Sequence, residues 1–127
     1  MTHGDTSERT ERRQRLATTP NPAPHHDALV RWSGALSDGR VLTLEFVPDR
    51  LVLAPEAFAG YLKRLEAATW PTLEALVLAV LDDLNNQLVP RWVRVGGSLE
   101  RGGIRHHATA NDRQPGWDNP GLLRASG

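Results

Sequence analysis

The stretch PRWVRVGGSLERGGIR, residues 90–105, carries four glycines in two pairs. The segments RWVRV (residues 91–95) and GIRHHATA (residues 103–110) are each typical of a strand. The glycine pairs flank the connection between these segments, where glycine relieves backbone strain in a turn or bulge. A phosphate-binding loop must be followed by a helix, and no helical pattern follows these glycines. The stretch therefore predicts a β-hairpin.

A second hairpin is predicted upstream, formed by DALVRWSGAL (residues 27–36) and RVLTLEFV (residues 40–47). The two runs are separated by SDG, and an Asp-Gly pair between strand-like runs is typical of a tight hairpin turn. In the second run side chains alternate between two faces with a period of two. One face of this hairpin is therefore expected to pack against a core and the other to be wetter.

Two amphipathic helices are predicted between the hairpins. The first follows Pro55, a residue that the first helical turn tolerates, and its apolar residues recur at helical spacing: Phe58, Tyr61, Leu62 and Leu65. The second is capped by Thr69 and carries Pro71 in its first turn, with Asp83 lying off its apolar stripe. The order ββααββ predicts an α+β fold, with two helices on one face of a four-stranded antiparallel sheet.

Composition excludes several classes of function. At 127 residues the chain forms one domain, and fifteen Lys+Arg balance fifteen Asp+Glu, so no net charge favours nucleic acid as a partner. No apolar run is long enough to span a membrane and the N-terminus lacks the apolar core of a secretory signal, which predicts a cytoplasmic protein without a membrane partner. The chain has no cysteine, which excludes disulfides, thiolate metal sites and thiol nucleophiles.

The composition also divides the chain into three parts. Residues 1–26 are polar or proline-rich without periodicity and are predicted to be a mobile N-terminal arm. Residues 27–110 hold all the predicted strands and helices and form the folded domain. Residues 111–127 are rich in Pro, Gly and Asn and are predicted to be an irregular tail.

The opening stretch is similar to part of the QueF family, the NADPH-dependent 7-cyano-7-deazaguanine reductases of queuosine biosynthesis. Three other pieces fall in the family's order: Asn21-Pro22, FVPD at residues 46–49, and DDL at residues 82–84. The resemblance covers residues 21–113. It implies the tunnelling fold (T-fold), in which subunits join their sheets into a barrel and bind a purine- or pterin-like ring at subunit interfaces. A homo-oligomer joined through its sheet edges is therefore expected.

The resemblance also implies site residues. It places Glu74 at the family's ring-binding glutamate, where a carboxylate accepts two parallel N–H bonds from a 2-amino-pyrimidinone edge. The alternative for Glu74 is an ordinary solvated acid in a first helical turn. Trp70, near Glu74, is a further substrate-binding candidate that would stack on the ring. Arg101, Gly102 and Gly103 match the family's RGGI beside the ligand pocket and are candidates for cofactor binding.

The chain departs from the family at three places. The segment with the cysteine that attacks the nitrile is absent, and the SDG turn stands in its place. The family's histidine before the glutamate is Leu73 here, and its nucleotide-associated E-S-K-S signature corresponds to APEA, residues 54–57, without the charges in place. Asp38 falls near the family's general-acid aspartate, and an Asp-Gly turn explains it equally well. These departures imply lost or changed chemistry, with NADPH as a cofactor only if reductase activity is retained.

Histidine pairs occur at His25-His26 and His106-His107. Adjacent residues on a strand point to opposite faces, so each pair offers at most one ligand to a metal, and no metal site is predicted. Three functions stay open. The first is a QueF-like protein that binds a 7-deazaguanine-, purine- or pterin-like ring at a subunit interface without thioimide chemistry. The second is an active nitrile reductase, for instance as the cysteine-free partner of a second subunit. The third is a structural module in a hetero-oligomer without a small-molecule ligand.

Overall fold

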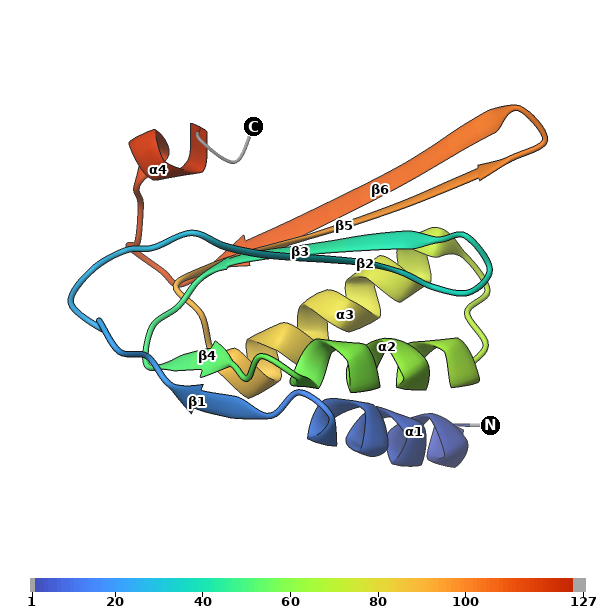
Figure 1. The fold of residues 1–127 in the computed structure, drawn as a ribbon, viewed down its shortest axis with the longest axis horizontal. Coiled ribbons are helices and arrows are strands. Elements are labelled where there is room, and N and C mark those ends of the chain that lie inside the picture. The colour runs from blue at the N-terminus through green and yellow to red at the C-terminus, as the bar shows by residue number, and fades with distance from the viewer. Residues whose placement is uncertain (1, 125–127) are drawn as a thin grey trace.

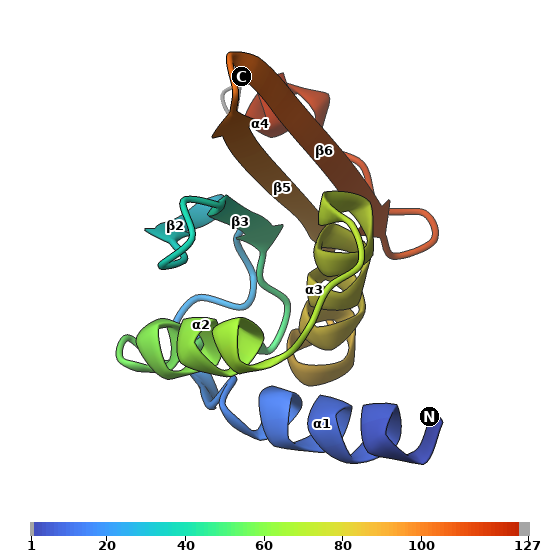
Figure 2. The same cartoon turned by 90° about the vertical axis from the view of Figure 1, so that its right-hand side faces the viewer.

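The computed structural model describes residues 2–124, and the side chains from Ser7 onward. Its centre is a four-stranded antiparallel sheet in the order β2-β3-β5-β6, with α2 and α3 on one face (Figures 1 and 2). The bounds are β2 (Val30–Ala35), β3 (Val41–Val47), α2 (Ala57–Ala67), α3 (Leu73–Leu88), β5 (Trp92–Arg101) and β6 (Ile104–Arg113). The predicted α+β class and its ββααββ order are confirmed. No helix among the described residues is long and apolar enough to cross a membrane.

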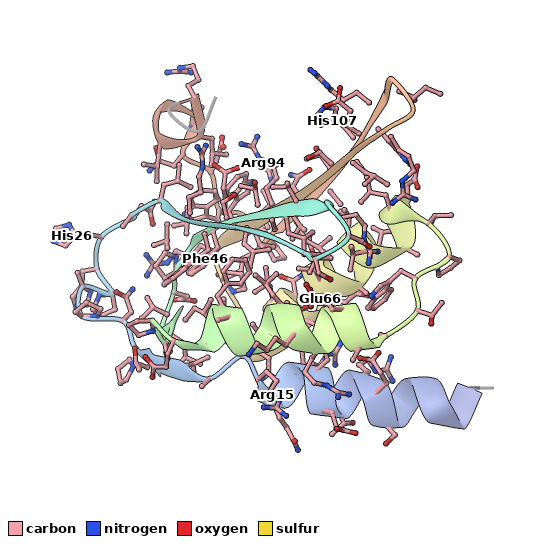
Figure 3. All side chains as sticks on the ribbon, turned by 45° about the vertical axis from the view of Figure 1, so that its right-hand side comes forward. Arg15, His26, Phe46, Glu66, Arg94 and His107 are labelled. Carbon is pink, nitrogen blue, oxygen red and sulfur yellow. The ribbon has the colours of Figure 1, made fainter. Side chains whose placement is uncertain are left out.

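The core lies between the sheet and these two helices. On β3 the residues Leu42, Leu44 and Phe46 alternate with more polar ones, and all three are fully buried toward the helices. Figure 3 shows Phe46 between the sheet and α2. From the helices, the apolar stripes predicted by spacing meet this face, including the fully buried Tyr61 and Leu65 of α2. The period-two and period-3.6 patterns therefore identified the buried sides of these elements.

Helix α3 begins one turn later than predicted. Its N-cap is Thr72, whose side chain accepts a hydrogen bond from the backbone N–H of Ala75 at 3.0 Å. Thr69, the predicted cap, lies in the connection between α2 and α3. The physical reason is Pro71, which disfavours helical backbone at the residue before it and so excludes Trp70 from a helix.

The two glycine pairs have different roles. Gly102 and Gly103 form the tight turn between β5 and β6 with φ of 60° and 78°, a left-handed conformation that glycine adopts readily. The first pair, Gly96-Gly97, lies inside strand β5 rather than in the connection. A Cβ atom at Gly97 would lie 2.8 Å from Cγ2 of Val77, so this glycine lets α3 pack directly on the sheet. The predicted hairpin is present, and its strands are longer than predicted.

The N-terminal residues form a helix and a strand that pack on the domain, where a mobile arm was predicted. Helix α1 (Thr2–Gln14) lies against α2 and α3 on the side away from the sheet (Figure 2), and β1 (Thr18–Pro20) pairs with β4 (Leu51–Leu53). Leu16 between them is buried in the core. At the other end, β6 runs past residue 110 and α4 (Pro120–Arg124) follows, where an irregular tail was predicted. Met1 and residues 125–127 lie outside the described residues.

A buried ionic cluster holds α1 in place. Asp83 of α3 is 0% exposed and accepts hydrogen bonds from Arg12 and Arg13 of α1 and from the Tyr61 hydroxyl of α2. Burial raises the pKa of Tyr61, and the negative charge of Asp83 raises it further, so Tyr61 stays a donor. The prediction that Asp83 lies off the buried stripe is wrong. Its hydrogen bonds from two arginines and a tyrosine offset the desolvation free energy of burying its charge.

Replacing Asp83 with alanine is expected to lower the free energy of unfolding by about 3–5 kcal/mol, because the buried guanidinium of Arg12 would keep only Glu8 of its own helix as a partner and the Tyr61 hydroxyl would lose its acceptor. Urea denaturation measures this loss. The matched control is Asp82→Ala, which changes an exposed neighbour on the same helix and should shift stability by less than about 0.5 kcal/mol. Equal losses in the two variants would contradict the role given to the cluster.

Candidate functional site

A pocket of about 580 Å³ opens between the hairpin end of the sheet and the connection from α2 to α3. Its floor is the helix-facing side of the sheet, beyond the apolar core. Its wall is formed by residues 68–74, which include the α2–α3 connection and the first residues of α3. The lining side chains that bear on its chemistry are Asp38, Arg40, Trp70, Thr72, Glu74, Leu99, Arg101 and His106.

The strand register explains why these floor residues share one face. Leu99 of β5 pairs with His106 of β6, and Arg101 is the next residue of β5 on the same face. Arg40 precedes β3 by one residue and keeps the alternation of the buried Leu42. His107 points to the opposite face, as Figure 3 shows. Of the predicted histidine pair, therefore, only His106 reaches the pocket.

Glu74 and His106 make a direct contact across the pocket edge. Glu74 lies in the first turn of α3, which Thr72 caps, and its Oε2 is 2.9 Å from Nε2 of His106. The hydrogen bond from His106, followed by a backbone N–H bond, holds the pKa of Glu74 below its usual value. Glu74 is thus a preorganised carboxylate with only part of its accepting capacity in use.

Trp70 separates the pocket from helix α1. Its indole N–H donates to the backbone carbonyl of Leu65 at 2.8 Å, which fixes the orientation of the ring. The guanidinium carbon of Arg12 lies 5.2 Å from the ring centroid. Trp70 therefore contributes to the wall of the pocket as a braced aromatic side chain.

Asp38 combines a turn role with a position at the pocket. Its Oδ1 accepts a hydrogen bond from the Arg40 backbone N–H at 3.0 Å, and its Oδ2 lies 2.8 Å from Nε of Arg40 as an ion pair. Burial acts to raise the pKa of Asp38, but hydrogen bonds from Arg40 and the charges of Arg40 and Arg101 hold it below its usual value. Gly102 and Gly103 lie at the hairpin tip, outside the pocket lining.

Two titratable residues of the pocket, Arg40 and His106, were not assigned to it from the sequence. Arg40 was not singled out, and His106 was considered only as a metal ligand. Counting with period two back from Leu42 would have placed Arg40 on the inner face, whereas the pairing of His106 with Glu74 depends on the position of α3 over β6. Among the side chains that the structure describes, from Ser7 to Arg124, no group of three His, Asp or Glu is close enough together to hold a metal ion.

Three motif pieces from the sequence meet at the opposite end of β3. Arg91 donates to Asp27 at 3.0 Å and to Asp49 at 3.3 Å, while the Asn21 side chain donates to the Asp49 carbonyl at 2.8 Å. The Gln114 amide also donates to Asp49, at 3.1 Å. These residues tie the chain before β2, the turn after β3 and the end of β6 together. Their role is architectural, and they are remote from the pocket.

No family model matches the chain. It is 32% identical over 126 residues to a Nitrosococcus oceani protein named NADPH-dependent 7-cyano-7-deazaguanine reductase, covering 86% of this chain and 92% of the relative. Relatives of the same name occur in Alkalilimnicola ehrlichii (29% identity; 80% and 87% covered) and Acidithiobacillus ferrooxidans (36%; 63% and 57%). A solved structure, described as the archaeosine synthase QueF-Like in the apo form, aligns with a TM-score of 0.49 and 18% identity, over 68% of this chain and 90% of that chain.

Replacing His106 with alanine should raise the pKa of Glu74 toward the usual glutamate value, because the carboxylate loses its main donor. Because the pKa of Glu74 is lowered in the folded state, the contact stabilises the protein fully at pH values above the usual glutamate pKa. This stabilisation is lost as the pH falls through the lowered pKa. A ¹³C NMR titration of the Glu74 carboxyl measures the shift. His107→Ala, on the outer face, is the control, and an unmoved Glu74 titration in His106→Ala would refute the contact.

Proposed function

The chain belongs to the QueF family of NADPH-dependent 7-cyano-7-deazaguanine reductases, and from this membership we propose that it binds a 7-deazaguanine, or a related purine- or pterin-like ring, through Glu74. One observation carries the proposal. Four residues singled out from sequence, Asp38, Trp70, Glu74 and Arg101, come from different elements and line one pocket. The pocket volume of about 580 Å³ falls in the range typical of small-molecule sites, about 300–1,000 Å³.

The pocket chemistry suits such a ring. Glu74 is ionised at neutral pH and, while His106 holds Oε2, it retains lone pairs for the parallel N–H donors of a 2-amino-pyrimidinone edge. Leu99 offers an apolar floor, and Trp70 an aromatic side chain that is already braced from behind. Little side-chain ordering would therefore accompany binding, which favours affinity.

Thioimide chemistry has no nucleophile here. The chain contains no cysteine. At the pocket, the Thr72 hydroxyl is engaged as the cap of α3 and His106 is bonded to Glu74, so neither belongs to an activated hydroxyl–base pair. We propose a binding function, with general acid–base chemistry on a related ring as the form that catalysis would take.

The segment matching the family's nucleotide signature does not fit the phosphates of NADPH. Ala54 and Ala57 are buried in the core, and the exposed side chain between them that carries charge is the acidic Glu56. A carboxylate repels phosphate, and neither alanine offers a donor group beyond its backbone. The residues present at this segment therefore give no support to a hydride-transfer role.

An assembly through the sheet edges is part of the proposal. Strands β2 and β6 form the two edges of the four-stranded sheet, and no further strand of the described chain lies beside either. Pairing of these edges between copies, or with a second kind of subunit, would satisfy their backbone groups and extend the sheet toward a barrel. The pocket would then lie close to a neighbouring subunit, which could complete it.

Glu74→Ala is expected to weaken ring binding at least about a hundredfold, because two charge-assisted hydrogen bonds contribute about 1.5–3 kcal/mol each. Calorimetric titration with 7-cyano-7-deazaguanine, guanine and a reduced pterin measures the loss. Glu56→Ala, an exposed acid outside the pocket, should bind as the unmodified protein does. Unchanged affinity in Glu74→Ala would refute the anchor. An absence of binding to all three ligands would favour the structural module.

Retained reductase activity is the second candidate, favoured by the names of the relatives. Without a cysteine, we expect the purified protein to show no NADPH oxidation that depends on 7-cyano-7-deazaguanine. Absorbance at the nicotinamide band follows the reaction, with a cysteine-containing family member as the positive control. Nitrile-dependent turnover by this protein alone would establish the reductase and overturn the binding-only function.

A further inference from the structure

The pocket has two chemically distinct ends. At one end Glu74 is held by His106 and presents an acceptor for N–H groups. At the other end lie Arg40 and Arg101, together with Asp38. Leu99 forms the floor between the two ends. A ligand that spans this pocket therefore contacts a carboxylate with one end and a cationic region with the other.

The strand register places the floor residues: Val41 pairs with Ser98, so Arg40 lies beside Leu99 on the side away from His106. Arg101 lies two residues beyond Leu99 on β5, and Leu99 pairs with His106. Residues of one strand that share a face are about 7 Å apart. This step separates Leu99 from Arg101 on the floor of the pocket. A ring anchored by its pyrimidine edge on Glu74 would thus direct the substituent of its second ring toward Arg101.

The cationic end has a net positive charge. Arg40 is paired with Asp38 and its side chain is only 15% exposed, so these two charges largely cancel. Arg101 has no carboxylate within ion-pair distance among the described residues, although the charge of Asp38 acts on it from further away. Arg105, the neighbouring arginine on the outer face of the hairpin, is instead paired with Glu100 at 3.6 Å.

We infer that the pocket selects a ring that carries an anionic substituent, with Glu74 binding the pyrimidine edge and Arg101 binding the anion. This inference rests on the proposed ring binding by Glu74. A neutral nitrile in the same place would offer the guanidinium a single weak acceptor. A carboxylate accepts two of its N–H groups in parallel and gains from opposite charge. The site is therefore better matched to a ring carboxylate than to the nitrile named in its relatives.

The test compares 7-cyano-7-deazaguanine with its 7-carboxylate analogue by calorimetry. In the unmodified protein we expect the carboxylate to bind about five- to tenfold more tightly, and added salt to weaken the carboxylate but not the nitrile. In Arg101→Gln the preference should fall below about twofold. The control Arg105→Gln lies on the same hairpin and should keep the full preference. Circular dichroism and urea denaturation confirm that both variants are folded.

The outcomes separate this inference from the proposed function. If both rings bind equally and Glu74→Ala abolishes both, the ring site stands and the selection for an anion is refuted. If the carboxylate is preferred equally in Arg101→Gln, the assignment of Arg101 is refuted. If the two rings bind equally and Arg101→Gln weakens the binding of NADPH, Arg101 binds a cofactor phosphate and the inference is overturned. If neither ring binds, the proposed function and the inference fall together.

Discussion

The buried carboxylate of Asp83 is the constraint on which the arrangement of the helices depends. It takes hydrogen bonds from α1 and α2 while it is itself part of α3, so one side chain connects three helices. A buried ion is stable only when its partners are all in place. Packing of the apolar faces leaves room for small changes in helix position, whereas this cluster specifies one docking of α1. It therefore determines which part of the α2–α3 surface α1 covers and leaves the α2–α3 connection to line the pocket.

The same cluster reaches the pocket through Arg12. Its guanidinium binds Asp83 and also lies over the Trp70 ring, which forms part of the pocket wall. Trp70 is fixed again by its bond to Leu65 at the end of α2. The connection that leads to Glu74 is thus braced from α1 and from α2, and the carboxylate is presented at a defined place. A polar N-terminal segment, which looks dispensable from its composition, supports the site from behind.

The sequence patterns predicted the elements whose formation depends on residues close together in the chain. The alternation in β3, the helical spacing in α2 and the Asp-Gly turn each placed an element correctly, because each depends on residues close in sequence. The docking of α1 could not be predicted this way, since Arg12 and Asp83 are 71 residues apart. Asp83 was misplaced because acidic residues are almost never fully buried unless paired. Glu74 and Arg101 could be named from a resemblance and Trp70 from its place near Glu74. The contact of Glu74 with His106 could not be predicted, because it depends on the packing of α3 over β6.

The two ends of β3 carry different parts of the family resemblance. At one end Asn21, Asp49 and Arg91 join three chain segments, and their contacts are intact. At the other end Leu73 precedes Glu74, a histidine from β6 holds Glu74, and the chain offers no cysteine. The motif residues Asn21, Asp49 and Arg91 therefore build the fold, whereas Arg101 of the same resemblance lies at the pocket. Function has to be argued from the pocket itself, where an ionised acceptor and an arginine without an ion-pair partner among the described residues face a common floor.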